Sequence, residues 1–168
     1  MWIIVDGYNL IRQWPELAVL DRADLQSGRE ALLRELQSYR RAKRHNITVV
    51  FDGREHGGFS EGIESAAGIG VRYSKRGETA DAVISRLVAQ GGGGAVVVTS
   101  DREVAEAARR RGAAWISAAE FVDRVEAARL DSLKGGEDEE IRPAKAGKGE
   151  ARRLPKAERR RQRRLGGL

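Results

Sequence analysis

The chain has 168 residues, enough for one domain with a hydrophobic core and an appended segment. It has no cysteine, which excludes disulfides and thiolate metal sites, and its two histidines do not favour a histidine-rich zinc site. No run approaches the roughly 18 consecutive apolar residues of a membrane helix, and the start of the chain lacks the basic region and the cleavage site of a signal peptide. We therefore expect a cytoplasmic protein without a membrane partner.

The net charge of +6 is unevenly distributed along the chain. From Arg142 to Leu168 there are 11 basic and two acidic residues, a net charge of +9, so the rest of the chain carries a net charge of −3. A basic segment of this kind favours binding to polyanions, most often nucleic acid.

Five apolar runs predict strands, at about residues 2–6, 47–52, 69–74, 95–99 and 114–117. Four of the runs are continuous rather than alternating, which is typical of strands covered on both faces. Helical patterns lie between them, at about residues 24–45, 79–90, 101–111 and 118–130. Residues 53–68 are predicted to form a loop, with room for a short helix around residues 61–67. Strands that alternate with helices predict an α/β fold with a mainly parallel sheet.

Carboxylates follow three of the predicted strands. Asp6 and Asp52 each come directly after an apolar run, and Asp101 follows the run Val96-Val97-Val98 by two residues. A fourth acid, Asp81, lies at the start of a predicted helix. Because the carboxyl ends of parallel strands meet at one edge of a sheet, these acids are expected to converge in one crevice.

Converging carboxylates need a cation. Two carboxylates about 4 Å apart repel each other by about 4 kcal/mol at an effective dielectric constant of ~20. A hard divalent ion offsets this repulsion, and ligands that offer only oxygen suit Mg²⁺ or Mn²⁺. Such an ion activates water and stabilises charge on a phosphoryl group, so the set of acids predicts a metal-dependent phosphoryl-transfer site.

Each acid taken alone also has a structural explanation. Asp6 and Asp52 each precede a glycine and suit an ordinary turn, whereas Asp81 and Asp101 suit the first turn of a helix, where a negative charge interacts favourably with the helix dipole. The presence of all four acids on one predicted edge favours the metal site.

Polar and basic residues surround these acids in the sequence. Asn9 is placed to position Asp6 or a substrate phosphate, or to cap the next turn. Four basic residues are candidates for contacts with substrate phosphates or for neutralising the acids, and these two roles are not separated here: Arg54, Lys75, Arg76 and Arg102.

Four segments resemble the YacP-like NYN domain, a branch of the PIN-like ribonucleases. They are Ile4-Val5-Asp6-Gly7-Tyr8-Asn9, Val50-Phe51-Asp52, Ser74-Lys75-Arg76-Gly77-Glu78-Thr79-Ala80-Asp81 and Val98-Thr99-Ser100-Asp101. The resemblance covers about residues 1–130 and does not extend beyond Leu133. It implies a PIN-like three-layer α/β/α sandwich with a central, mainly parallel sheet, in a nuclease domain at residues 1–133.

The resemblance also implies an activity and a set of site residues. The expected activity is an endoribonuclease dependent on Mg²⁺ or Mn²⁺, acting in bacterial mRNA decay or rRNA processing, with RNA and the ribosome as partners. By position, Asp6, Asp81 and Asp101 are the metal-binding catalytic acids, and Asn9 and Asp52 support them.

Residues 134–168 are interpreted as a basic tail that is disordered or becomes helical on binding. Its arginines are expected to contact RNA phosphates without sequence preference. These arginines are Arg152, Arg153, Arg159, Arg160, Arg161, Arg163 and Arg164. A tail that only increases solubility is the alternative.

Three other functions compete with the endoribonuclease. A non-catalytic RNA-binding module of the same fold would not need the four acids. A phosphotransfer receiver domain would usually carry a lysine after the last strand, and residues 113–117 contain none. A structure-specific DNA nuclease would use the same chemistry and is the hardest to distinguish.

Overall fold

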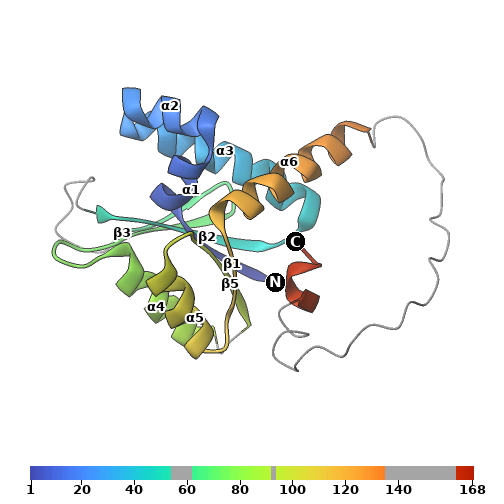
Figure 1. Cartoon of the computed structure of the whole chain (residues 1–168). Coiled ribbons are helices and arrows are strands. Elements are labelled where there is room, and N and C mark those ends of the chain that lie inside the picture. The colour runs from blue at the N-terminus through green and yellow to red at the C-terminus, as the bar shows by residue number, and fades with distance from the viewer. Residues whose placement is uncertain (54–61, 92–93, 135–161) are drawn as a thin grey trace, which may run out of the picture.

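The apolar runs pair into one six-stranded sheet (Figure 1). The computed structural model describes residues 1–53, 62–91, 94–134 and 162–168. The strands are β1 (Trp2–Asp6), β2 (Asn46–Phe51), β3 (Gly62–Ala66), β4 (Ile69–Tyr73), β5 (Ala95–Val98) and β6 (Ala114–Ile116). Their order across the sheet is β3-β4-β2-β1-β5-β6, and every neighbouring pair is parallel except β3 with β4. The predicted α/β fold with a mainly parallel sheet is confirmed.

Helices cover both faces of the sheet, giving the three layers expected (Figure 1). Alternate strand residues point to opposite faces, so Ile3 and Val5 of β1 belong to one core cluster and Ile4 to the other. The first cluster packs under α1 (Gly7–Gln13), α2 (Pro15–Ala23), α3 (Leu25–Lys43) and α6 (Ala118–Lys134), and the second under α4 (Ala80–Gln90) and α5 (Arg102–Arg110). Among the described residues, no helix has the length and apolarity needed to cross a bilayer.

Helices α1 and α2 were not predicted from the sequence. Their buried residues Leu10, Ile11, Trp14 and Leu17 have helical spacing, but the helices are short and are separated by one residue. Asp6 caps the start of α1, and Pro15 occupies the first turn of α2, where its missing N–H costs nothing. The two helices bring the segment after Asp6 back over the sheet.

Strand β3 replaces part of the predicted loop, and the suggested short helix around residues 61–67 was wrong. β3 pairs with β4 in an antiparallel hairpin closed by Ala67 and Gly68, whose φ angles are 48° and 84°. Two consecutive residues with positive φ form the tight hairpin turn, which usually selects Asn-Gly or Asp-Gly. Ala-Gly does not carry that signal, which explains why the hairpin was missed.

The last described segment, residues 162–168, packs against the domain. Residues 162–165 form a helical turn, and Leu165 and Leu168 are buried in the core cluster under α3 and α6. Arg124 donates a hydrogen bond to the Leu165 carbonyl at 2.6 Å, and His45 Nε2 lies 2.9 Å from the Gly167 carbonyl oxygen. The two leucines give this otherwise polar segment an apolar anchor.

Replacing Leu165 by alanine is expected to lower the free energy of unfolding by about 2–4 kcal/mol, because the cavity it leaves lies in the core. Leu133→Ala is the control, since that side chain is 73% exposed and its loss should cost less than about 0.5 kcal/mol. Urea unfolding followed by circular dichroism measures both. Equal values for the two variants would mean that the closing turn does not stabilise the fold.

Candidate active site

Asp6 is the last residue of β1 and lies at the carboxyl edge of the sheet. Its side chain is 9% exposed, accepts a hydrogen bond from the Asn9 amide at 3.2 Å, and lies 3.5 Å from the Thr99 hydroxyl, which donates to it. Burial raises the pKa of Asp6 to about 6, and the charge of Asp81 adds to this effect, while the two hydrogen bonds oppose it. A buried carboxylate with this pKa is the kind of group that a cation would stabilise.

The glycines that follow β1 and β2, Gly7 and Gly53, are packed so tightly that no larger side chain fits at either position. A Cβ on Gly7 would lie 2.4 Å from the Phe51 ring, and one on Gly53 would lie 1.8 Å from the Ser74 carbonyl oxygen. Gly53 also donates its amide hydrogen to the Ser74 hydroxyl at 2.9 Å. These contacts fix the turn that carries Asp52, which is half-buried, at the same edge as Asp6.

Asp81 is the centre of the electrostatic interactions among the acids. It is the second residue of α4, a helix capped by the Thr79 hydroxyl rather than by Asp81 itself. Partial burial raises the pKa of Asp81, and the charges of Asp101, Glu103 and Asp52 raise it further, in that order. Since Asp81 also raises the pKa of Asp6, Asp81 lies within electrostatic range of each of the other three predicted acids.

Asp101 has a structural role in addition to its place in the acidic group. It caps α5, and its Oδ1 accepts hydrogen bonds from the amides of Glu103 at 2.7 Å and Val104 at 3.3 Å. Its own amide donates to the Thr99 hydroxyl at 3.1 Å, and the same hydroxyl faces Asp6. Thr99 therefore joins the Asp6 carboxylate to the backbone amide of Asp101. Asp101 caps α5 and its charge also raises the pKa of Asp81, so its structural role accompanies its place in the acidic group.

Asn9 holds the loop after β5 in place. Its side-chain carbonyl accepts a hydrogen bond from the Ser100 amide at 2.8 Å, and the Ser100 hydroxyl accepts one from the Ala118 amide at 3.2 Å at the start of α6. This chain of contacts joins α1, the β5–α5 loop and α6. Asn9 is thus a positioning residue for the segment that carries Asp101.

The acids do not form a complete ligand set for direct coordination. Within residues 1–53, 62–91, 94–134 and 162–168, no three histidine or carboxylate side chains are arranged to hold one ion. Mg²⁺ commonly binds through one or two carboxylates and keeps several waters, so a site at this edge would not need three direct protein ligands. All-oxygen donors and raised carboxyl pKa values fit a hard divalent ion at this edge.

The basic candidates fall into three groups. Lys75, Arg76 and Arg102 are exposed on the segments that carry the acids. Arg163 and Arg164 lie elsewhere, because Arg164 donates to the Gly112 carbonyl at 3.1 Å, just before β6 begins. The remaining candidates lie outside the described residues: Arg54, Arg152, Arg153, Arg159, Arg160 and Arg161.

Two residues near the acids were not assigned to the site from the sequence. Glu103 lies in the first turn of α5, and its charge raises the pKa of Asp81. Arg12 is exposed on α1, with its guanidinium carbon 5.9 Å from the centre of the Tyr8 ring, and its charge lowers the pKa of Asp6. Arg12 lies six residues beyond Asp6 in the sequence, and only a helix over this segment brings the two residues near each other. Because α1 was not predicted, Arg12 was not assigned to the site.

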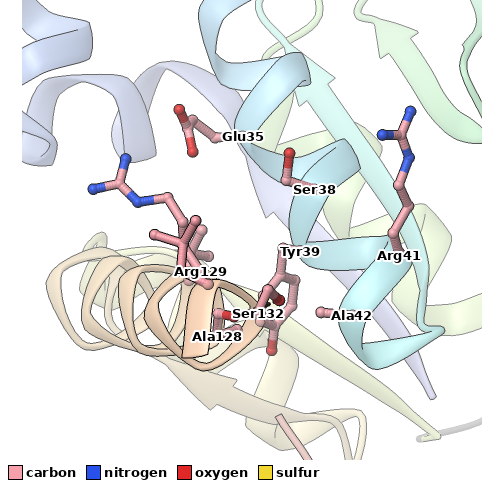
Figure 2. A pocket seen from close by; sticks show the side chains of 10 residues that line it. Glu35, Ser38, Tyr39, Arg41, Ala42, Ala128, Arg129 and Ser132 are labelled. Atoms are coloured by element: carbon pink, nitrogen blue, oxygen red, sulfur yellow. Dashed lines mark hydrogen bonds between the residues drawn. The ribbon is translucent and has the colours of Figure 1, made fainter. Parts of the chain in front are cut away.

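Glu78 faces a different partner from the acids. Its carboxylate pairs with Arg86, and this hydrogen bond lowers the pKa of Glu78. A groove of about 460 Å³ also lies apart from the acids, between the C-terminal halves of α3 and α6 (Figure 2). Glu35, Tyr39, Arg41 and Arg129 contribute to its lining, and none of the four predicted acids does. The acidic group at the carboxyl edge of the sheet is the candidate active site.

Comparison with known proteins identifies the family and supports the fold. The model of the YacP-like NYN domain family matches residues 3–165, beyond the point at Leu133 where the sequence resemblance was expected to end. The protein "Uncharacterized protein YacP" of Bacillus subtilis (strain 168) is 32% identical over 85 residues, which are 51% of this chain and 49% of that protein. The chain thus aligns with about half the length of this relative.

Two crystal structures of Rae1 (YacP) from Bacillus subtilis superpose on the chain. A point mutant of Rae1 gives a TM-score of 0.69 at 27% identity, covering 79% of both chains. The unmutated protein gives a TM-score of 0.67 at 27% identity, covering 81% of this chain and 79% of that one.

Proposed function

Because the chain belongs to the YacP-like NYN domain family, which is nuclease-like, we propose that it is an endoribonuclease dependent on Mg²⁺ or Mn²⁺. The observation that carries the proposal is the position of Asp81 at the centre of the acidic group. The charges of Asp101, Glu103 and Asp52 raise the pKa of Asp81, and the charge of Asp81 in turn raises the pKa of Asp6. Carboxylates gathered at the carboxyl edge of a parallel sheet suit a phosphoryl-transfer site.

In this proposal Asp6 and Asp81 hold the divalent ion directly, and Asp101, Asp52 and Glu103 act through its waters. When bound, the ion supplies a water of lowered pKa and neutralises charge on the phosphoryl oxygens. Asn9 and Thr99 fix the loop that carries Asp101. The overall reaction adds water across one P–O bond of the RNA backbone, with one RNA fragment leaving as an alcohol.

The exposed cations of the crevice contribute to substrate binding in the same proposal. Arg12, Lys75, Arg76 and Arg102 contact backbone phosphates on either side of the cleaved bond. Their positions beside the acids support this role, since a cation next to the acidic group offsets the repulsion between acids and substrate.

The cellular setting is proposed from the resemblance and the composition. A nuclease domain at residues 1–133 acts in the cytoplasm on mRNA or rRNA, in association with the ribosome. The basic residues between 134 and 168 add RNA affinity without sequence preference.

Cleavage assays with RNA and DNA of identical sequence separate this proposal from a DNA nuclease and from a non-catalytic module. Hairpin and single-stranded forms of each are incubated with the full chain and Mn²⁺, and in parallel with EDTA. We expect the RNA substrates to be cut only with the metal. Faster cleavage of DNA would favour the DNA nuclease, and binding of RNA without any cleavage would favour the module.

A further inference from the structure

The edge of the sheet opposite the acids carries a concentration of cations, which are exposed except for the half-buried Arg164. Helices α3 and α5 both end where the next parallel strand begins, so their last residues lie at the amino edge. The closing turn of the chain contributes two more arginines. We call this set the basic edge: Arg41, Lys43, Arg44, Arg109, Arg110, Arg111, Arg163 and Arg164.

The closing turn joins the two helix ends into one surface. Arg164 donates to the Gly112 carbonyl at 3.1 Å, directly after Arg111. Three residues further on, the Gly167 carbonyl lies 2.9 Å from His45, directly after Arg44. The segment 164–167 therefore spans the space between the end of α3 and the end of α5, and the three groups of cations are neighbours.

Stabilisation of the helix ends does not account for so many cations. A cation in the last turn of a helix contributes about 0.3–1 kcal/mol through the helix dipole, and this effect fades within that turn. Arg111 caps α5 from outside the helix, and Arg163 belongs to a different segment. Glu106 lies 3.7 Å from Arg110, but the two side chains are 68% and 70% exposed, so this pair offsets little of the charge.

We propose that the basic edge binds the phosphate backbone of structured RNA, at a surface separate from the cleavage site. Seven of its eight residues are arginines, whose planar guanidinium groups bind phosphate oxygens in pairs. This proposal rests on the proposed function, since it takes RNA as the partner of the whole protein.

The separation of the two edges indicates the size of the RNA. Strand β1 has five residues, and a strand of that length spans about 16 Å at ~3.3 Å per residue. An RNA that occupies both edges must therefore extend well beyond the bond that is cut. The basic edge would select folded RNA over short fragments by charge and shape, without reading its sequence.

The test compares two variants of the full chain that lose the same charge. Arg111→Gln with Arg163→Gln removes two cations of the basic edge, and Arg22→Gln with Arg34→Gln removes two exposed arginines of α2 and α3 outside it. Binding to a labelled hairpin RNA is measured by fluorescence anisotropy in EDTA at several salt concentrations. Working in EDTA makes the result independent of cleavage, so a failure here is distinguishable from a failure of the proposed endoribonuclease.

We expect the basic-edge variant to bind the RNA about tenfold more weakly. The slope of log affinity against log salt concentration should decrease in magnitude by about one to two, because each lost phosphate contact removes roughly 0.7–0.9 from that slope. The control variant should change binding less than twofold, and urea unfolding should match the unmodified protein for both. Equal effects of the two variants, or no binding of RNA by the unmodified chain, would overturn the proposal. Binding to phosphatidylserine vesicles is measured in parallel. If the basic-edge variant loses vesicle binding but keeps its RNA binding, the partner of the basic edge is a lipid surface and the proposal is overturned.

Discussion

Asp81→Asn is expected to slow RNA cleavage by about 10²–10⁴-fold while leaving the fold intact. A bound divalent ion contributes several kcal/mol to stabilising a phosphoryl transition state, and each 1.36 kcal/mol corresponds to a tenfold change in rate. Although its carboxylate is partly desolvated, Asp81 lies at the surface and does not cap α4, since the Thr79 hydroxyl performs that role. Its replacement therefore removes a proposed metal ligand while leaving the cap of α4 in place.

Single-turnover cleavage with saturating Mn²⁺ measures the loss, and circular dichroism checks the fold. Asp123→Asn is the matched control, because that acid is exposed on α6 and lies outside the acidic group. Its rate should stay within about twofold of the unmodified protein. An Asp81→Asn protein that keeps the rate of this control would exclude Asp81 from catalysis.

Asp6→Asn is expected to stabilise the metal-free protein at neutral pH while abolishing cleavage. The pKa of Asp6 is about 6 in the folded protein against a usual value of 3.8, so burying its charge above pH 6 costs about 2–3 kcal/mol. Asparagine retains an oxygen for the Asn9 amide and carries no charge. The acid is thus retained at a cost in stability, which is typical of a functional residue.

The sign of the pH dependence follows from the raised pKa. The folded protein binds the Asp6 proton more tightly than the unfolded chain, so this contribution to stability is complete below about pH 4 and is lost as the pH rises through 6. Urea unfolding in EDTA at pH 4.5 and at pH 7.5 measures this effect. The free energy of unfolding of the Asp6→Asn variant, relative to that of the unmodified protein, should increase as the pH rises. A difference between the two proteins that does not change with pH would show that Asp6 is not desolvated in the folded state.

The sheet and the grouping of acids at its carboxyl edge could be predicted because both depend on simple periodic signals. Continuous apolar runs gave β1, β2, β4, β5 and β6, and the edge at which parallel strands end placed Asp6, Asp52 and Asp101 together. Asp81 was predicted to lie near these three acids because α4 begins at the same edge of the sheet. The electrostatic influence of Asp101 and Asp52 on Asp81 agrees with this placement.

The features that were missed depend on contacts between distant segments or on unusual backbone angles. The hairpin of β3 and β4 turns at Ala67, a residue that rarely has positive φ. The buried position of Leu165 depends on a surface built by α3 and α6, and nothing in the neighbouring arginines indicates it. Arg12 reaches Asp6 only because α1 turns back over the sheet.

Cleavage of one labelled RNA by protein stripped of metal with EDTA, and then resupplied with Mn²⁺, tests most directly whether the acids act through a divalent ion. We predict no cleavage above background in EDTA, recovery of the full rate on addition of excess Mn²⁺, and no recovery in the Asp81→Asn protein at the same Mn²⁺ concentration. Cleavage in EDTA at the rate seen with Mn²⁺ would contradict a metal-dependent site at the carboxyl edge of the sheet.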